Sequence, residues 1–157
     1  MVLVHGAFAE SASWNDVIRR LQDNGHTTIA AAIPTRGLTD DTNLVASILE
    51  SVSGPVMLVG YSYGGSVITN AARDNENVKA LVYVAGFAPE EGESIGELSA
   101  RSPGSTLGDT LWTVPLSDGT NDLYIRQDMY HQQFAADVPA DQPLSWPRPN
   151  DRFGTSR

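Results

Sequence analysis

The sequence predicts an α/β fold in which a mostly parallel sheet is covered by helices on both faces. Four segments consist almost wholly of apolar residues, and segments with helical periodicity follow the first three of them. Such continuous apolar runs are typical of parallel strands, which are buried on both faces. A glycine-rich turn also joins the third apolar segment directly to a helix. The expected strands are residues 1–4, 27–33, 56–61 and 78–85.

Three helices are expected between these strands. The first carries apolar residues at helical spacing from Trp14 to Leu21, and residues 13–16 form a capping-box pattern at its start. The second runs through residues 44–49, with Asp40, Asp41 or Thr42 as its cap. The third spans residues 66–73 and follows the glycine-rich turn.

The second half of the chain has a different composition. Residues 90–108 are rich in Glu, Gly and Ser, and a predicted hairpin follows around the turn at residues 117–120. Residues 127–136 are expected to be helical. We therefore divide the chain into a core (1–89), a lid or cap region (90–140) and an irregular tail (141–157).

The composition excludes several classes of function. The chain has 157 residues, of which 41% are hydrophobic, enough for one globular domain with a core. The net charge of −9 argues against a nucleic-acid partner, because phosphate binding needs clustered Lys and Arg. There is no cysteine, no metal-ligand spacing and no phosphate loop, so no metal or other cofactor is expected. We find no membrane span or signal peptide and expect a cytoplasmic protein without membrane contact.

Ser62 is the candidate nucleophile. The third strand runs into a G-x-S-x-G turn, in which Gly60 and Gly64 flank the serine. This motif exposes the serine hydroxyl on a sharp turn, and its small residues let a helix start at once. The backbone N–H groups of Ala7 and Tyr63 are the candidate oxyanion hole, since they follow the first strand and the nucleophile. The alternative is that the serine is only a small residue in a strand–helix turn.

The base that should activate Ser62 is not evident. In this motif an acid and then a histidine normally follow the serine. The one histidine after it is His131, whose place on the lid helix favours a structural role. His5 lies beside the expected oxyanion hole and is predicted to support it through hydrogen bonds, and both histidines stay candidates for a substitute base. The most interesting acid, Glu90, is better explained as an exposed loop charge.

These motifs together resemble the α/β-hydrolase superfamily, and within it the small esterases related to plant methylesterases and hydroxynitrile lyases. The resemblance covers almost all of residues 1–140. It implies Ser62 as nucleophile, the Ala7 and Tyr63 amides as oxyanion hole, and ester or other acyl hydrolysis without a cofactor. His131 matches a lid position in such proteins and not the triad histidine. The matching segments are VLVHGAF (2–8), GHTTIAAAIP (25–34), VMLVGYSYGG (56–65), VKALVYVAGFAPEEGES (78–94) and LYIRQDMYHQQFAADVPA (123–140).

The resemblance ends near Leu144. Members of the family continue into further strands that supply the triad acid and histidine, so this chain reads as C-terminally truncated and its sheet as incomplete on that side. We interpret residues 145–154 as a frameshifted reading of a family gene, a hypothesis that the coding sequence can test. The fourth strand then keeps an unpaired apolar edge, which predicts a homodimer or higher oligomer.

The expected function is that of a serine hydrolase that transfers the acyl group of a small carboxylic ester to water through Ser62. A small-molecule ester is thus the expected substrate. The alternative is a truncated, weakly active or inactive relative that keeps only a small-molecule pocket. A third possibility, cyanohydrin lysis, occurs in the resembled family but also needs the missing histidine.

Overall fold

The computed structural model describes residues 1–139. The chain forms two compact units, of which the first spans Met1–Ser105 and the second begins at Thr106. The first unit thus includes residues 90–105, which the sequence assigned to the lid region. The expected irregular tail, residues 141–157, lies outside the described residues.

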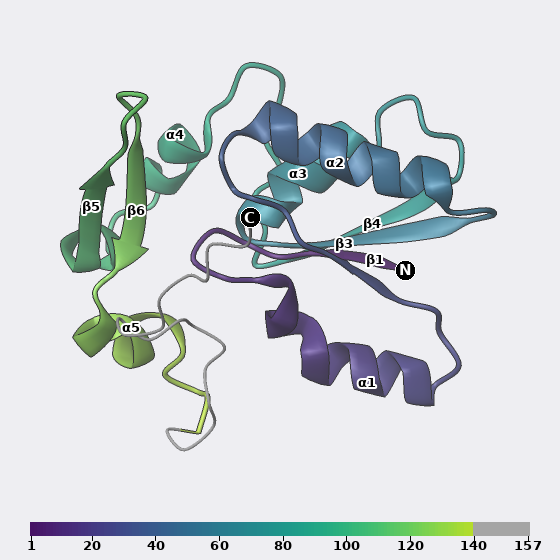
Figure 1. The fold of residues 1–157 in the computed structure, drawn as a ribbon, viewed down its shortest axis with the longest axis horizontal. Helices are drawn as coiled ribbons and strands as arrows, with labels where there is room; N and C mark the ends of the chain where they lie inside the picture. Colours follow the sequence, from purple (N-terminus) through teal and green to yellow (C-terminus); the bar gives the residue numbers. More distant parts are fainter. Residues whose placement is uncertain (140–157) are drawn as a thin grey trace. The chain divides into compact units, whose positions relative to one another are not determined.

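The first unit contains a parallel four-stranded sheet in the order β2-β1-β3-β4, of which Figure 1 labels β1, β3 and β4. Its strands are β1 (Val2–Val4), β2 (Ile29–Ala31), β3 (Val56–Tyr61) and β4 (Val78–Val84). All four lie within the apolar runs that predicted them, which confirms the expected fold class. The second strand is shorter than expected because it pairs with β1, which has only three residues.

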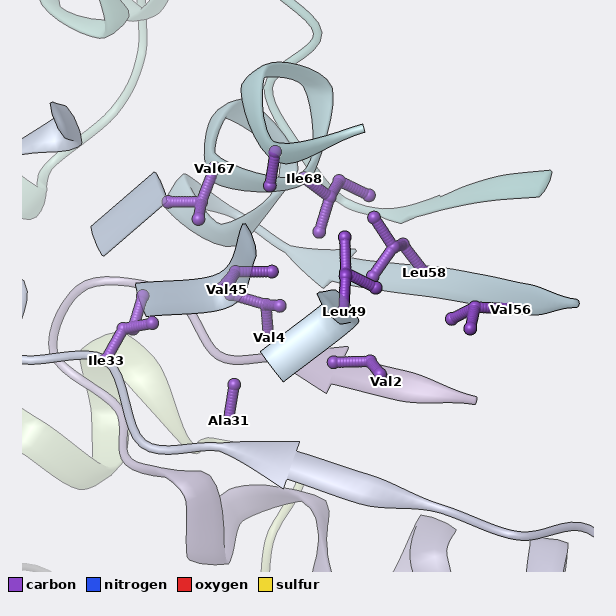
Figure 2. Close-up of a cluster of buried hydrophobic side chains, with 11 residues drawn as sticks. Val2, Val4, Ala31, Ile33, Val45, Leu49, Val56, Leu58, Val67 and Ile68 are labelled. Atoms are coloured by element: carbon purple, nitrogen blue, oxygen red, sulfur yellow. The ribbon is translucent and has the colours of Figure 1, made fainter. Parts of the chain in front are cut away.

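Helices cover both faces of this sheet. α2 (Leu38–Ser51) and α3 (Tyr63–Ala71) lie on one face, and α1 (Asn15–Asp23) lies on the other (Figure 1). The larger core joins the strands to α2 and α3 through aliphatic side chains (Figure 2). A smaller core around Leu3 and Val59 packs on the side of α1. Because successive residues of a strand point to opposite faces, the continuous apolar runs fill both cores.

The capping box expected at residues 13–16 is wrong. Ser13 lies inside a 3-10 turn, η1 (Ser11–Trp14), and its hydroxyl donates to the carbonyl oxygen of Glu10 at 2.6 Å. A capping residue needs a non-helical backbone and a side chain that accepts from the helix. Ser13 meets neither condition, and Trp14 takes the capping position of α1 without a side-chain bond.

α2 begins earlier than the apolar spacing indicates. Its capping residue is Gly37, so Asp40, Asp41 and Thr42 lie inside the helix and none of them caps it. Asp41 is fully buried there. Because Asp41 does not cap α2, its carboxylate can accept hydrogen bonds from groups outside the helix. The sequence did not reveal this role.

A short helix, α4 (Ile95–Ala100), was not predicted. It has a true capping box: the Ser94 hydroxyl accepts from the Glu97 N–H at 3.2 Å, and the Glu97 carboxylate accepts from the Ser94 N–H at 3.0 Å. Six residues are too few to establish an apolar periodicity, so only this cap could have indicated the helix.

The second unit contains the hairpin and helix that the sequence predicts. β5 (Leu111–Pro115) and β6 (Asn121–Ile125) pair antiparallel, and α5 (Gln127–Phe134) follows them. A 3-10 turn, η2 (Leu107–Thr110), precedes the hairpin. Across residues 1–139, no helix is long and apolar enough to cross a membrane.

β4 lies at one edge of the sheet, and within the described part of the chain β3 is its one neighbouring strand. Val82, Tyr83 and Val84 are 38%, 37% and 43% exposed. The apolar edge expected from the sequence is therefore open in this part of the chain. An open strand edge offers unpaired N–H and C=O groups to another strand.

Candidate active site

Ser62 stands at the sharp turn between β3 and α3. Its backbone has φ 52° and ψ −120°, a conformation that a residue with a side chain rarely adopts. Such strain costs roughly 1–3 kcal/mol and persists only where the surroundings enforce it. Here the Ser62 N–H donates to the Val84 carbonyl at 3.3 Å, and the Ser62 carbonyl accepts from the N–H groups of Gly65 and Phe87, each at 3.0 Å.

The glycines of the motif are required by close backbone contacts. A Cβ added to Gly60 would lie 2.5 Å from the carbonyl oxygen of Gly64. A Cβ added to Gly64 would lie 2.4 Å from the carbonyl oxygen of Val4. Only glycine allows these approaches. They bring the end of β1 against the first turn of α3, next to the serine.

The loop after β1 touches the serine itself. A Cβ added to Gly6 would lie 2.8 Å from the Cβ of Ser62. Ala7 is the next residue in this loop and is half-buried. Tyr63 is the first residue of α3, where backbone N–H groups have no partner within the helix. The structure thus brings the loop that carries Ala7 together with Ser62 and Tyr63. Gly6 was missed as a site residue, although a glycine at a strand exit was a signal.

His5 is buried, with 3% of its surface exposed, and its Nδ1 lies 2.9 Å from the carbonyl oxygen of Gly6. Because a carbonyl oxygen only accepts, Nδ1 donates in this bond. The Gly6 carbonyl and the Ala7 N–H belong to the same planar peptide group. His5 therefore fixes the plane that sets the direction of the Ala7 N–H.

The other predicted polar residues are placed differently. His131 belongs to the second unit, where its Nε2 donates to the carbonyl oxygen of Val138 at 2.9 Å. Within the described residues, the His5 ring bonds to the Gly6 carbonyl and not to the Ser62 hydroxyl. Glu90 is exposed, and its backbone N–H donates to the Glu93 carboxylate at 2.8 Å.

An unexpected contact joins Tyr63 to α2. The Tyr63 hydroxyl donates to the Asp41 carboxylate at 2.6 Å, and the Thr35 N–H donates to the other carboxylate oxygen at 3.0 Å. Burial raises the pKa of the Tyr63 phenol, and the hydrogen bond to Asp41 and its negative charge raise that pKa further. The sequence contains one signal at this position, an Asp near the start of a predicted helix. That signal indicated a helix cap and not a bond to Tyr63.

Comparison with known proteins places these features among hydrolases. The model of the alpha/beta hydrolase family matches residues 1–156. The carbendazim hydrolyzing esterase of Nocardioides sp. (strain SG-4G) is 34% identical over 114 residues, which cover 64% of this chain and 47% of that esterase. This chain thus spans about half the length of that relative.

Solved structures with a similar fold include a pyrethroid hydrolase and a methylketone synthase. PytH, a pyrethroid hydrolase, is 22% identical with a TM-score of 0.72, and the match covers 96% of this chain and 64% of that one. Tomato methylketone synthase I, complexed with beta-ketoheptanoate, is 20% identical with a TM-score of 0.66, over 83% of this chain and 58% of that one. At these identities the likeness establishes the fold alone.

Proposed function

Because this chain belongs to the alpha/beta hydrolase family, we propose that it hydrolyses small carboxylic esters with Ser62 as the nucleophile. The Ser62 oxygen forms a bond to the acyl carbon, and the electron pair of the C=O bond moves to the carbonyl oxygen. The N–H groups of Ala7 and Tyr63 stabilise that oxyanion. The oxyanion then re-forms the C=O bond while the C–O bond to the alcohol part breaks, and the leaving oxygen takes up the proton that the general base removed from Ser62. Water attacks the acyl-serine ester in the same way, which releases the acid and returns a proton to the Ser62 oxygen. This sequence of steps needs no cofactor.

The observation that carries this proposal is the strained backbone of Ser62 in contact with the Gly6 loop. Strained residues gather at functional sites, because the surrounding structure must stabilise them against relaxation. Both candidate oxyanion donors also belong to peptide groups whose carbonyl ends are bonded. The Gly6 carbonyl accepts from His5, and the Ser62 carbonyl accepts from Gly65 and Phe87. The two N–H groups are thereby preorganised, which is what oxyanion stabilisation requires.

One relative supports the proposed substrate class. The Nocardioides protein is an esterase that hydrolyses carbendazim, which supports an ester as the substrate here. It does not select one ester, because this chain aligns with 47% of that protein.

The proposed reaction requires a general base. A serine hydroxyl reacts slowly unless a base removes its proton. The candidates are His5, His131, a carboxylate or a group from a second subunit. Within the described residues, the His5 ring bonds to the Gly6 carbonyl and not to Ser62, and this favours a second candidate function. In that case the chain is a weakly active or inactive relative that binds small molecules in the same site.

The test compares p-nitrophenyl butyrate hydrolysis by the wild-type chain, Ser62→Ala and a matched control, Ser66→Ala. Ser66 is fully buried on the same helix, and its hydroxyl has no hydrogen-bond partner among residues 1–139. We expect steady turnover in the wild type and Ser66→Ala, and at least about a thousandfold loss in Ser62→Ala. Loss in His131→Ala would then identify His131 as the base. Loss in His5→Ala would identify His5 as the base only if the pH dependence of kcat is lost as well, because His5 also holds the peptide group of the Ala7 N–H.

Equal rates in the wild type and Ser62→Ala would overturn the proposal. A ligand that raises the melting temperature without turnover would instead support the binding function. Turnover must depend on Ser62 to support a nucleophile. Oxyanion stabilisation and substrate binding alone can keep the rate about a thousandfold above that of the uncatalysed reaction in water.

A further inference from the structure

Tyr63 carries two groups that point to different parts of the first unit. Its backbone N–H begins α3 beside Ser62, and its phenol bonds to Asp41 on α2. We propose that Asp41 is a positioning residue of the oxyanion site, which holds the Tyr63 side chain and thereby fixes the Tyr63 N–H beside Ser62. The inference rests on the proposed function of Ser62.

Asp41 joins three separate segments. Its side chain lies in the first turn of α2, accepts from Tyr63 on α3 at 2.6 Å, and accepts from the Thr35 N–H in the loop after β2 at 3.0 Å. Both carboxylate oxygens are thus used, and the first turn of a helix further favours a negative charge. A hydrogen bond to an ionised group is stronger than one between neutral groups.

The need for this anchor arises from the strain at Ser62. The ψ angle of Ser62 and the φ angle of Tyr63 together orient the peptide group between these residues. Relaxation of the strained ψ of −120° would turn this peptide group and redirect the Tyr63 N–H. The carbonyl end of the group is held by Gly65 and Phe87, and Asp41 holds the residue at its other end.

Packing alone does not explain Asp41. A carboxylate with 0% exposure is unfavourable in a protein interior unless hydrogen bonds compensate for its lost hydration. An apolar pair at positions 41 and 63 would pack on the same core without that requirement. The buried Asp41–Tyr63 pair is therefore better explained by a requirement for one fixed direction of the Tyr63 side chain beside Ser62.

The test uses Tyr63→Phe and a matched control, Tyr83→Phe. The phenol of Tyr83 also contacts α3, and its hydroxyl lies 2.8 Å from the Thr69 hydroxyl. Two measurements are made on each variant: kcat and KM with p-nitrophenyl butyrate, and hydrogen exchange of the amides of Gly65 and Phe87. These amides bond to the Ser62 carbonyl, so their exchange reports how often the turn opens.

We expect Tyr63→Phe to speed exchange at both amides by about tenfold relative to the slow amides of β3, as loss of a bond to a buried carboxylate allows. We also expect kcat to fall by about tenfold with KM changed less than about twofold, since the affected interaction acts in the transition state. Tyr83→Phe should leave both measurements near wild type. Asp41→Asn, which keeps an acceptor oxygen, should retain more activity than Asp41→Ala.

Equal exchange at Gly65 and Phe87 in the two tyrosine variants would overturn the inference. So would a uniform acceleration that includes the amides of β3, because that pattern means global destabilisation. A wild-type chain without Ser62-dependent turnover would refute the proposed function instead. In that case the exchange comparison alone decides whether Asp41 holds the turn.

Discussion

Gly6 lies directly against Ser62, so that a Cβ on Gly6 would stand 2.8 Å from the Ser62 Cβ and 3.0 Å from the Tyr61 carbonyl oxygen. Cβ atoms do not approach other atoms this closely without displacing them. The glycine thus allows the loop after β1 to reach the turn after β3, and two segments far apart in the sequence meet at one place.

Gly6→Ala should damage both stability and turnover. The added methyl group forces the β1 loop away from Ser62, and such overpacking typically costs about 1–3 kcal/mol in the free energy of unfolding. The matched control is Gly96→Ala in α4, where the nearest atom to the new Cβ is the Ser94 hydroxyl at 3.9 Å. Urea denaturation and p-nitrophenyl butyrate turnover check both variants. If Gly6→Ala lowers stability and turnover no more than Gly96→Ala does, the contact between Gly6 and Ser62 is not required for either property.

Two replacements of Ser62 should show how much the strained backbone at this residue costs in stability. Ser62→Gly relieves the unfavourable φ of 52°, whereas Ser62→Ala keeps it. Glycine also gains entropy in the unfolded chain, so we expect a net advantage of about 1 kcal/mol for Ser62→Gly over Ser62→Ala. Urea denaturation measures the difference. Equal stability of the two variants would mean that the turn stores no strain at this residue.

The Tyr63 phenol should make stability fall at high pH. Its pKa is raised in the folded chain, so the folded state holds this proton more tightly than the unfolded state. Its contribution is fully present below the unfolded pKa of about 10 and is lost as pH rises toward the folded pKa. The slope is at most ~1.4 kcal/mol per pH unit, and solvent screening of the half-buried phenol reduces it.

The measurement compares the free energy of unfolding of wild type and Tyr63→Phe near pH 9 and near pH 11, on either side of the unfolded pKa of about 10. We expect any advantage of the wild type to shrink at the higher pH, because Tyr63→Phe has no phenol to titrate at this position. All other groups are common to the two proteins, so their contributions cancel in the difference. An advantage that grows with pH contradicts the direction of the pKa shift.

We propose that the open edge of β4 pairs with a second copy of the chain. A lysine on an edge strand discourages such pairing, so Val84→Lys should shift the chain toward monomer in light scattering. The control is Val17→Lys on α1, since Val17 and Val84 are 41% and 43% exposed. A wild-type chain that is monomeric at working concentration would exclude the proposed pairing.

Local sequence signals predicted much of the fold. Apolar runs located all four strands of the sheet, and the family match confirms the resemblance that the motifs carried. Gly60 and Gly64 marked the serine turn because close backbone approach demands glycine wherever it occurs. The second unit's hairpin and helix also followed from turn residues and spacing.

The parts that the sequence did not predict depend on tertiary contacts or very short elements. Ser13 lies inside a 3-10 turn and does not cap α1 as expected. α4 is too short to show an apolar periodicity. The bond from Tyr63 to Asp41 joins residues on two helices that only folding brings together. No spacing rule relates such residues, because their contact is set by how α2 and α3 pack on the sheet.

The role of Ser62 is tested most directly with a fluorophosphonate probe, followed by mass analysis of the peptide that contains residue 62. An activated serine displaces fluoride and keeps the phosphonyl group. We expect the label on Ser62 in the wild-type chain and no label in Ser62→Ala. An unmodified Ser62, or equal labelling of both proteins, would contradict its assignment as the nucleophile.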